Sequence, residues 1–437
     1  DSTLLFESRE GVGILLKNCE NVTLKNVRLD FENPTNFQGT VMAIDPEGYY
    51  LDFYIPAGYP DVGNGTDDNL LYFFDGETGD YLQTGSFNAL KVSRLEALAP
   101  RQYRLYSNTV ARIKGLKVGD TLTWGNRLAA GHAIKLDTSK QCRLEQVTIH
   151  GGQVGIFCAD GYGDHTFESV QIIPGPRYLG AIEDRRMSTI ADAMHLQRME
   201  HGVHIKDSLI AASGDDGFNN YGSYFRIAEV LKDRTVILAC SATAHPEVGD
   251  VLRIYSDERV LVAETLITAL EELESYQSDV NTDRFIAQKH YQVTLSESGA
   301  WETGDWVANA SKNCSGFSIV NTTYKNLHGR GVLIKGSDGL VENCTFENIG
   351  IAGILITPEF DILESDYARD ITVKSNTFIG CRLRGAAIHV KSDGNWYHER
   401  LQFLDNTFIE SPNFDMDIAH VKDLTIQGDT TNSNIEK

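Results

Sequence analysis

The sequence predicts an all-β fold, a parallel β-helix carrying two inserted antiparallel β-barrel-like segments. Short stretches of similar pattern recur at a period of roughly 20 to 30 residues, which is the signature of a repeat architecture. Examples are NVTLKNVRLDF, GLVENCTFENIG and DITVKSNTFIGC. Within each, apolar residues alternate at period two and are interrupted by Asn, Asp and Gly, a pattern typical of short strands joined by turns.

A second strand leads each repeat. Seven heptads, HAIKLDT, VGIFCAD, DAMHLQR, DGFNNYG, RGVLIKG, AGILITP and AAIHVKS, align without gaps. Their third and fifth positions are mostly apolar and are expected to point inward, so the fourth and sixth face outward. The outward fourth positions are Lys135, Phe157, His195, Asn219, Leu333, Leu355 and His389. The outward sixth positions include Asp137, Gln197, Tyr221, Lys335, Thr357 and Lys391.

Two long segments break the period and divide the chain. We expect coils over 1–37, an inserted β-barrel-like subdomain over 38–126, coils over 127–222, a second inserted β-rich subdomain over 223–312, and coils over 313–437. Both insertions combine alternating strands with a Val-Gly-Asp turn. Long insertions at one rim of a solenoid tend to be functional. Within the second insertion, residues 260–276 are the stretch with a helical pattern.

Composition limits the partners. The net charge of −22 and the pI near 4.9 argue against nucleic acid and against an anionic membrane surface, because both would be repelled. No apolar run approaches the roughly 20 residues that cross a bilayer. A neutral glycan suits this charge better than a sulfated or uronic-acid-rich one. The seven cysteines include no C-x-x-C pair, and no phosphate-binding glycine loop or zinc signature is present, so we expect no disulfide framework, metal or cofactor.

Three aspartates form the strongest chemical signal. Asp192 and Asp216 occupy the head position of consecutive heptads, so in a β-helix they lie in register, roughly 4.8 Å apart, with Asp215 beside them. Three crowded carboxyl groups cannot all ionise freely at neutral pH, and one is expected to keep a proton. A protonated Asp can act as general acid on a glycosidic oxygen while an ionised one activates water. Such a pair about 6.5–9.5 Å apart inverts the anomeric centre, whereas about 5 Å indicates a retaining nucleophile.

The face around the aspartates is rich in side chains that recognise sugar hydroxyls, and Tyr221 and Trp396 are available to stack on a ring. The predicted substrate-binding residues are His195, Gln197, Asn219, Tyr221, Arg330, Lys335, Glu359, His389 and Trp396.

An Asp followed one coil later by an Asp-Asp pair resembles the right-handed β-helix glycoside hydrolases. The polygalacturonases among them also need Asn-Thr-Asp-Gly, Gly-His-Gly and Arg-Ile-Lys motifs, whereas this chain has IADA at 190–193 and lacks the other two. The pattern is more similar to glycoside hydrolase family 110: an Ala-Asp before a strand, the Asp-Asp pair with a following Asn, and two inserted β-rich segments with QGTV and Gly-Asp turns.

That resemblance implies an inverting, metal-free exo-α-1,3-galactosidase on a right-handed β-helix, with Asp215 as acid and with Asp192 and Asp216 holding the nucleophilic water. It also implies a secreted or periplasmic enzyme whose partner is an oligosaccharide or polysaccharide with terminal α-galactose. The chain departs from the family at Asn220-Tyr221-Gly222, where the motif ends in Val-His-Gly, and this puts the substrate in question.

Other interpretations stay open at this point. One is a different polysaccharide hydrolase of the same fold, acting on an algal galactan, an α-glucan or a galacturonan. Another is a non-catalytic glycan-binding solenoid, which leaves the aspartate cluster unexplained. The exposed ends of a solenoid and its insertions could also support a homodimer.

Overall fold

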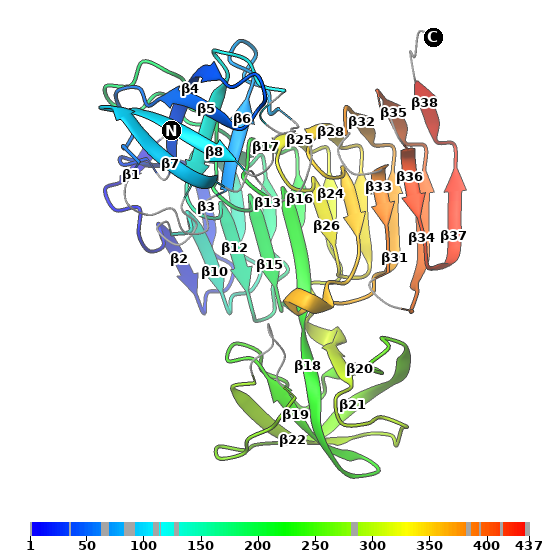
Figure 1. The fold of residues 1–437 in the computed structure, drawn as a ribbon. Coiled ribbons are helices and arrows are strands. Elements are labelled where there is room, and N and C mark those ends of the chain that lie inside the picture. The colour runs from blue at the N-terminus through cyan, green and yellow to red at the C-terminus, as the bar shows by residue number, and fades with distance from the viewer. Residues whose placement is uncertain are drawn as a thin grey trace.

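The computed structural model describes residues 2–34, 36–62, 70–82, 92–107, 113, 115–125, 131–280, 287–381, 386–392, 395–410 and 414–432. Parallel strands stack into a right-handed parallel β-helix from which antiparallel subdomains project, as Figure 1 shows, and this confirms the predicted fold class. No helix among the described residues is long and apolar enough to cross a membrane.

One parallel column of strands carries the heptads. Its members are β2 (Ile14–Lys17), β10 (Ile134–Asp137), β12 (Ile156–Ala159), β15 (Met194–Gln197), the start of β18 (Phe218–Lys232), β26 (Val332–Ile334), β29 (Ile354–Ile356), β33 (Ala386–Val390) and β36 (Phe414–Ile418).

A 17-stranded sheet completes the coils. It contains β1 (Ser2–Phe6), β3 (Thr23–Phe31), β11 (Arg143–Ile149), β13 (Thr166–Glu168), β14 (Gln171–Ile172), β16 (His204–Lys206), β17 (Leu209–Ala211), β24 (Ser318–Val320), β25 (Thr323–Leu327), β27 (Gly339–Glu342), β28 (Thr345–Ile349), β31 (Arg369–Lys374), β32 (Thr377–Ile379), β34 (His398–Leu404), β35 (Thr407–Ile409), β37 (Val421–Gln427) and β38 (Thr430–Asn432).

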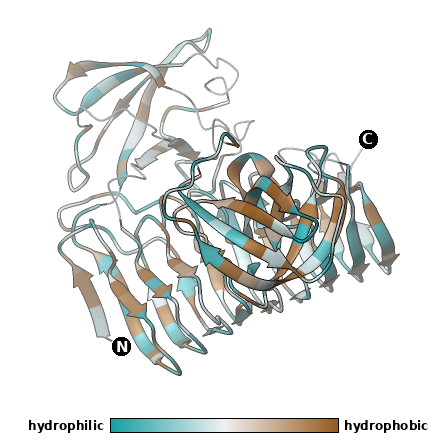
Figure 2. Ribbon diagram, turned by 90° about the horizontal axis from the view of Figure 1, so that it is seen from below, coloured by the Kyte–Doolittle hydropathy of each residue, from teal (hydrophilic) through white to brown (hydrophobic). Residues whose placement is uncertain are grey.

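The register of the heptads is the one that the gap-free alignment predicts. Met194 pairs with Phe218, Phe218 with Val332, and the series continues through the later coils without a shift. The predicted inward side chains are buried in one continuous core; they include Met194, Leu196, Val332, Ile334, Ile388 and Val390. Figure 2 shows hydrophobic and hydrophilic residues interspersed along these strands, as expected when one face of each strand is buried.

The first insertion forms an antiparallel sheet of its own. Its strands are β4 (Asn36–Ile44), β5 (Tyr50–Tyr54), β6 (Leu70–Phe74), β7 (Val92–Ala99), β8 (Gln102–Ser107) and β9 (Thr121–Gly125), in the order β6-β9-β4-β5-β8-β7. A separate apolar cluster containing Phe53, Leu105 and Trp124 forms its core. The domain limits read from the sequence stay predictions; this sheet begins at Asn36, two residues before the predicted start of the insertion, and its other strands lie inside the predicted range.

The second insertion closes into a six-stranded antiparallel barrel. Its strands are the outer part of β18, β19 (Thr235–Cys240), β22 (Lys289–Leu295), β21 (Leu261–Glu272), β20 (Val251–Tyr255) and β23 (Trp306–Asn309), which pairs with β18 again. The helical expectation for 260–276 is therefore wrong. The strand β21 pairs along both edges, and Thr265 and Ile267 point inward at alternate positions, a β-branched pattern that suits a strand.

The loop after β29 links the barrel to the coils. It contains the 3-10 turn η3 (Phe360–Ile362) and the short strand β30 (Glu364–Ser365), which pairs with β18. Phe360 is fully buried against aromatic residues of the barrel, and its ring stacks on Tyr224 with centroids 4.1 Å apart. A second 3-10 turn, η2 (Ala310–Lys312), returns the chain from the barrel to the coils.

Candidate active site

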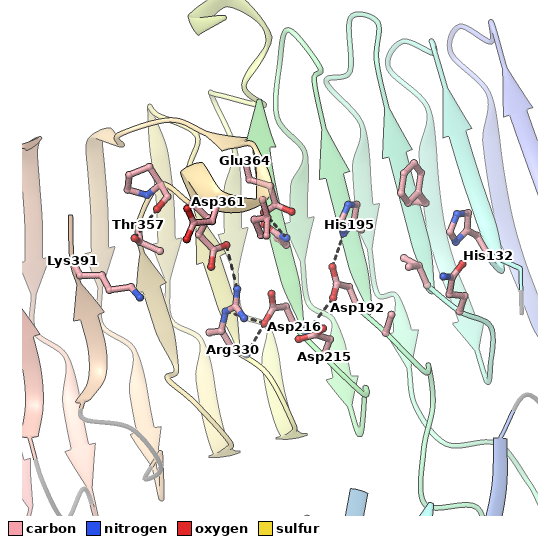
Figure 3. Close-up of a pocket in the computed structure, with 18 of the residues that line it drawn as sticks. His132, Asp192, His195, Asp215, Asp216, Arg330, Thr357, Asp361, Glu364 and Lys391 are labelled. Atoms are coloured by element: carbon pink, nitrogen blue, oxygen red, sulfur yellow. Dashed lines mark hydrogen bonds and ion pairs between the residues drawn. The ribbon is translucent and has the colours of Figure 1, made fainter. Parts of the chain in front are cut away.

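The catalytic candidates come from three neighbouring coils. Asp192, Asp216 and Arg330 each stand two residues before a strand of the heptad column, and the register of β15, β18 and β26 brings them side by side. Main-chain hydrogen bonds fix this alignment, from Ala193 N–H to the Asp216 carbonyl (2.8 Å) and from Gly217 N–H to the Arg330 carbonyl (2.8 Å). Figure 3 shows the three side chains converging on one point of the cleft.

The three aspartates form one cluster, as the sequence predicts. One oxygen from each of Asp192, Asp215 and Asp216 lies within 4.8 Å of the others. Asp192 and Asp216 are buried and Asp215 is half-buried. The Asp216 backbone N–H donates to Asp192 Oδ1 at 3.3 Å, so the aspartates also contact one another directly.

Arg330 neutralises part of this charge. Its backbone N–H donates to Asp216 Oδ1 at 2.7 Å, and its Nε lies 3.2 Å from the same oxygen. Burial raises the pKa of Asp216 well above its ordinary value; Arg330 opposes this shift, and the charges of Asp215 and Asp192 reinforce it. The arrangement supports the expectation that the cluster keeps a proton at neutral pH.

His195 connects Asp192 to a buried hydrogen-bond chain. Its Nδ1 lies 2.6 Å from Asp192 Oδ2, and its Nε2 lies 2.7 Å from the Tyr221 hydroxyl. The Tyr221 hydroxyl donates to Gln197 Oε1 at 2.8 Å. Burial alone would lower the pKa of His195, but the hydrogen bond and the charge of Asp192 raise it overall.

Lys335 holds together the side chains of Asn219, Glu359 and Glu364, which line the cavity. Its ammonium group is fully buried, lies 2.8 Å from Glu359 Oε2, and also pairs with Glu364. Asn219 accepts from the same ammonium at 3.3 Å and donates to Glu364 at 3.4 Å. Although burial opposes it, the charges of Lys335 and Arg330 lower the pKa of Glu359, so this carboxylate stays ionised.

These residues surround a cavity of about 660 Å³. A space of this size accommodates a small oligosaccharide. Seven of the predicted site residues line it: Asp192, His195, Asp215, Asp216, Asn219, Arg330 and Glu359.

The other five predicted residues do not line the cavity. Gln197 and Tyr221 lie behind His195, and Lys335 lies behind the two glutamates. His389 faces Asp417, with its Nε2 3.5 Å from Oδ2. Trp396 packs beside the aromatic cluster around Phe360, and its ring is covered by Lys422 at 4.2 Å. Neither predicted stacking residue therefore offers its ring to this cavity.

Several lining residues had not been predicted as contacts. Those on the coils had a signal, because they stand at the head or at outward positions of the aligned heptads: His132, Phe157, Thr357 and Lys391. The rings of His132, Phe157 and His195 stack face to face, with successive centroids 4.6 and 5.1 Å apart. Ser392 ends an aligned heptad, whereas Gln153, Asp361 and Glu364 had no such signal because they lie outside the heptads.

The three aspartates are also a possible set of metal ligands. The three aspartate oxygens are close enough together to meet at one cation. However, the Arg330 guanidinium already supplies a positive charge beside Asp216. A carboxylate cluster in this setting does not by itself specify a metal, since crowded carboxyls also serve acid–base chemistry.

Comparisons with known proteins agree with the fold and name an activity for relatives. The family model described as "Right handed beta helix region" matches residues 302–431. A protein of Akkermansia muciniphila named alpha-1,3-galactosidase A is 26% identical, over 98% of this chain and 71% of its own length. Proteins of the same name from Shewanella woodyi and Bacteroides fragilis are 24% and 23% identical, over 91% and 96% of this chain and 67% and 70% of theirs.

Proposed function

We propose that this chain, a β-helix homologue of proteins named alpha-1,3-galactosidase, is a glycoside hydrolase that removes terminal α-1,3-linked galactose from glycans. The proposal rests on the cluster of Asp192, Asp215 and Asp216, which lines a cavity of about 660 Å³. Replacing each of these aspartates by asparagine, which has nearly the same size but cannot act as an acid or base, would test the chemistry directly.

The proposed reaction uses a shared water. Two carboxylate oxygens within 4.8 Å can both hold one water molecule, because that gap is less than twice a hydrogen bond of about 2.8 Å. We assign this water to Asp192 and Asp216. Its oxygen attacks the anomeric carbon, the bond to the leaving oxygen breaks, Asp215 protonates that oxygen, and a proton of the water passes to the base. The product would leave as β-galactose, with inversion of the anomeric configuration. The aspartate oxygens lie within 4.8 Å of one another, short of the roughly 6.5–9.5 Å usual for an inverting pair, so this proposal places the water beside the carboxylates and not between acid and base.

Charge favours a neutral substrate. The cavity is lined by six carboxyl groups, against which stand His195, Arg330 and Lys391; the six are Asp192, Asp215, Asp216, Glu359, Asp361 and Glu364. A sulfate or uronate group would be repelled here. The sulfated algal galactans and the galacturonans are therefore the less favoured alternatives. Export from the cytoplasm, to the periplasm or the medium, is part of the same proposal.

The decisive experiment is hydrolysis of Gal-α-1,3-Gal followed by proton NMR of the product as it forms. Early β-galactose supports both the substrate class and inversion. Early α-galactose would keep the substrate but require one aspartate to act as a nucleophile. If folded protein releases nothing from this disaccharide, nothing from a panel of galactans and glucans, yet binds them, the non-catalytic solenoid is the correct reading.

A further inference from the structure

The hydroxyl of Tyr221 determines which protons its neighbour must carry. A tyrosine hydroxyl has a single proton, and this one is donated to Gln197 Oε1 at 2.8 Å. Burial raises the pKa of Tyr221 well above its ordinary value, so the hydroxyl keeps that proton. The oxygen can then only accept from His195 Nε2, which lies 2.7 Å away. His195 Nε2 therefore carries a hydrogen.

The other ring nitrogen faces a carboxylate. His195 Nδ1 lies 2.6 Å from Asp192 Oδ2, slightly shorter than the roughly 2.7–2.9 Å of a charge-assisted N–H···O hydrogen bond and shorter than a neutral one. The second oxygen of Asp192 already accepts the backbone N–H of Asp216, which favours the ionised carboxylate. Both ring nitrogens of His195 therefore face acceptors, and only the imidazolium form carries a hydrogen on each.

We propose that His195 is held as an imidazolium that donates from both ring nitrogens and thereby keeps Asp192 ionised and oriented as the base. His195 is thus a positioning residue, with Tyr221 and Gln197 fixing its protonation from behind. The role of Asp192 as base rests on the proposed function; the protonation state of His195 does not.

The charges around the ring agree with this state. Asp192 and Glu364 favour the cation, while burial and Lys335 oppose it, and the net effect on the pKa of His195 is upward. From β12 the uncharged ring of Phe157 covers one face. Beyond it His132, whose pKa burial and the charge of His195 lower to about 4, is neutral and adds no competing charge.

A consequence is that the three carboxyl groups become unequal. An ionised Asp192 beside a cation has no need of a proton, so the proton that the cluster keeps belongs to the Asp215–Asp216 pair. This is the pair that borders Arg330 and contains the carboxyl group whose pKa is raised. The protonated carboxyl that acts as the acid and the ionised one that acts as the base would then already be distinguished before the substrate binds.

The first test needs no substrate. Protein labelled with ¹⁵N-histidine is titrated by NMR, and the resonances of His195 are assigned by their loss in His195→Asn. We expect both ring nitrogens of His195 to be protonated at pH 7 and to stay so at a higher pH than in free histidine. One bare ring nitrogen at pH 7 would overturn the proposal. In Tyr221→Phe, which removes the acceptor, the second proton should leave at a lower pH; an unchanged titration would also count against the proposal.

The second test separates positioning from mere packing. His195→Asn places an amide donor at about the position of Nδ1 but cannot titrate. If the wild type is active, we expect His195→Ala to lower kcat/KM at pH 7 by at least about tenfold, because the Asp192 carboxylate loses the hydrogen bond that orients it. His195→Asn should recover most of it without the alkaline decline that loss of the histidine proton causes. A decline that persists in His195→Asn would contradict the role of His195. An inactive wild type whose His195 is doubly protonated would instead refute the proposed function alone.

Discussion

Arg330 binds one oxygen of Asp216 twice, through its backbone N–H at 2.7 Å and through Nε at 3.2 Å. Both residues are buried, so the pair is screened little by solvent. Asp216 precedes β18 and Arg330 precedes β26, so the ion pair links two neighbouring coils, one on each side of the inserted barrel in the sequence. Its removal should therefore affect both the fold and the titration of the site.

Removal of the guanidinium in Arg330→Met should lower the free energy of unfolding by about 3–5 kcal/mol at pH 7, because it leaves Asp216 buried without its counter-ion. A carboxyl group whose pKa is raised on folding destabilises the fold above its unfolded pKa, and the penalty falls as it gains a proton. The loss should thus shrink between pH 7 and pH 4. Urea unfolding at several pH values measures it. Arg400→Met, which breaks the exposed pair with Asp370, is the control and should change little.

Asp215→Asn should reduce kcat by about 10²–10⁴-fold, the usual contribution of a general acid, while circular dichroism and the melting temperature stay close to wild type. Asp361→Asn is a matched control, because Asp361 lines the same cavity but is largely exposed. Equal losses in the two variants would remove the special role assigned to Asp215.

Gly329→Ala tests how closely the chain passes the aspartates. A Cβ at Gly329 would lie 2.4 Å from Asp216 Oδ1 and 2.7 Å from Asp215 Oδ1, closer than atoms normally approach. Displacement of these carboxylates should lower kcat strongly, and overpacking should cost about 1–3 kcal/mol of stability. At Gly115 the same methyl group meets nothing within 4 Å, so Gly115→Ala should keep full activity. Wild-type kcat in Gly329→Ala would show that the carboxylates need not hold these positions.

Phe360→Ala should loosen the loop that presents Glu359 and Asp361 to the cavity. Loss of a buried phenylalanine costs about 3–5 kcal/mol, and here the cost falls on the contact between loop and barrel. We expect KM to rise more than kcat falls, because the aspartates lie on other coils. Steady-state kinetics checks this, with the exposed Val248→Ala as control. A selective loss of kcat would contradict the assignment of this loop to binding.

A galactoside sulfated on the terminal sugar should be hydrolysed at least about tenfold less efficiently than its neutral counterpart, because the lining carries more carboxyl groups than cations. Added salt should narrow the difference, since screening weakens repulsion. A preference for the sulfated compound would return the algal galactans to first place.

The repeating part of this structure could be predicted from the sequence because short-range alternation of apolar and polar residues determines it. Period-two alternation decides which side chains enter the core, and the gap-free heptads place Asp192, Asp216 and Arg330 in one row. The same reasoning fails where one element covers another. Lys335 stands at an outward position, yet it is fully buried, because the loop with Glu359 and Glu364 folds over it.

Non-repeating segments left no such signal. Glu364 reaches the cavity through a loop whose shape depends on the burial of Phe360 in the barrel, a contact between distant parts of the chain. The helical pattern at 260–276 was misleading for a related reason. Leu and Glu favour helices locally, but pairing with β20 and β22 on both edges decides the outcome for β21.

The strand β18 begins in the coil and ends in the barrel without an intervening turn. Its residues Phe218 to Tyr221 pair with β15, and Tyr224 to Arg226 pair with β23. The barrel is therefore connected to the coil that holds Asp215 and Asp216 by one continuous strand. The residues that line the cavity come from the coils and from the loop after β29. We therefore expect discrimination among glycans to depend on these walls, with the barrel contributing by holding that loop through Phe360.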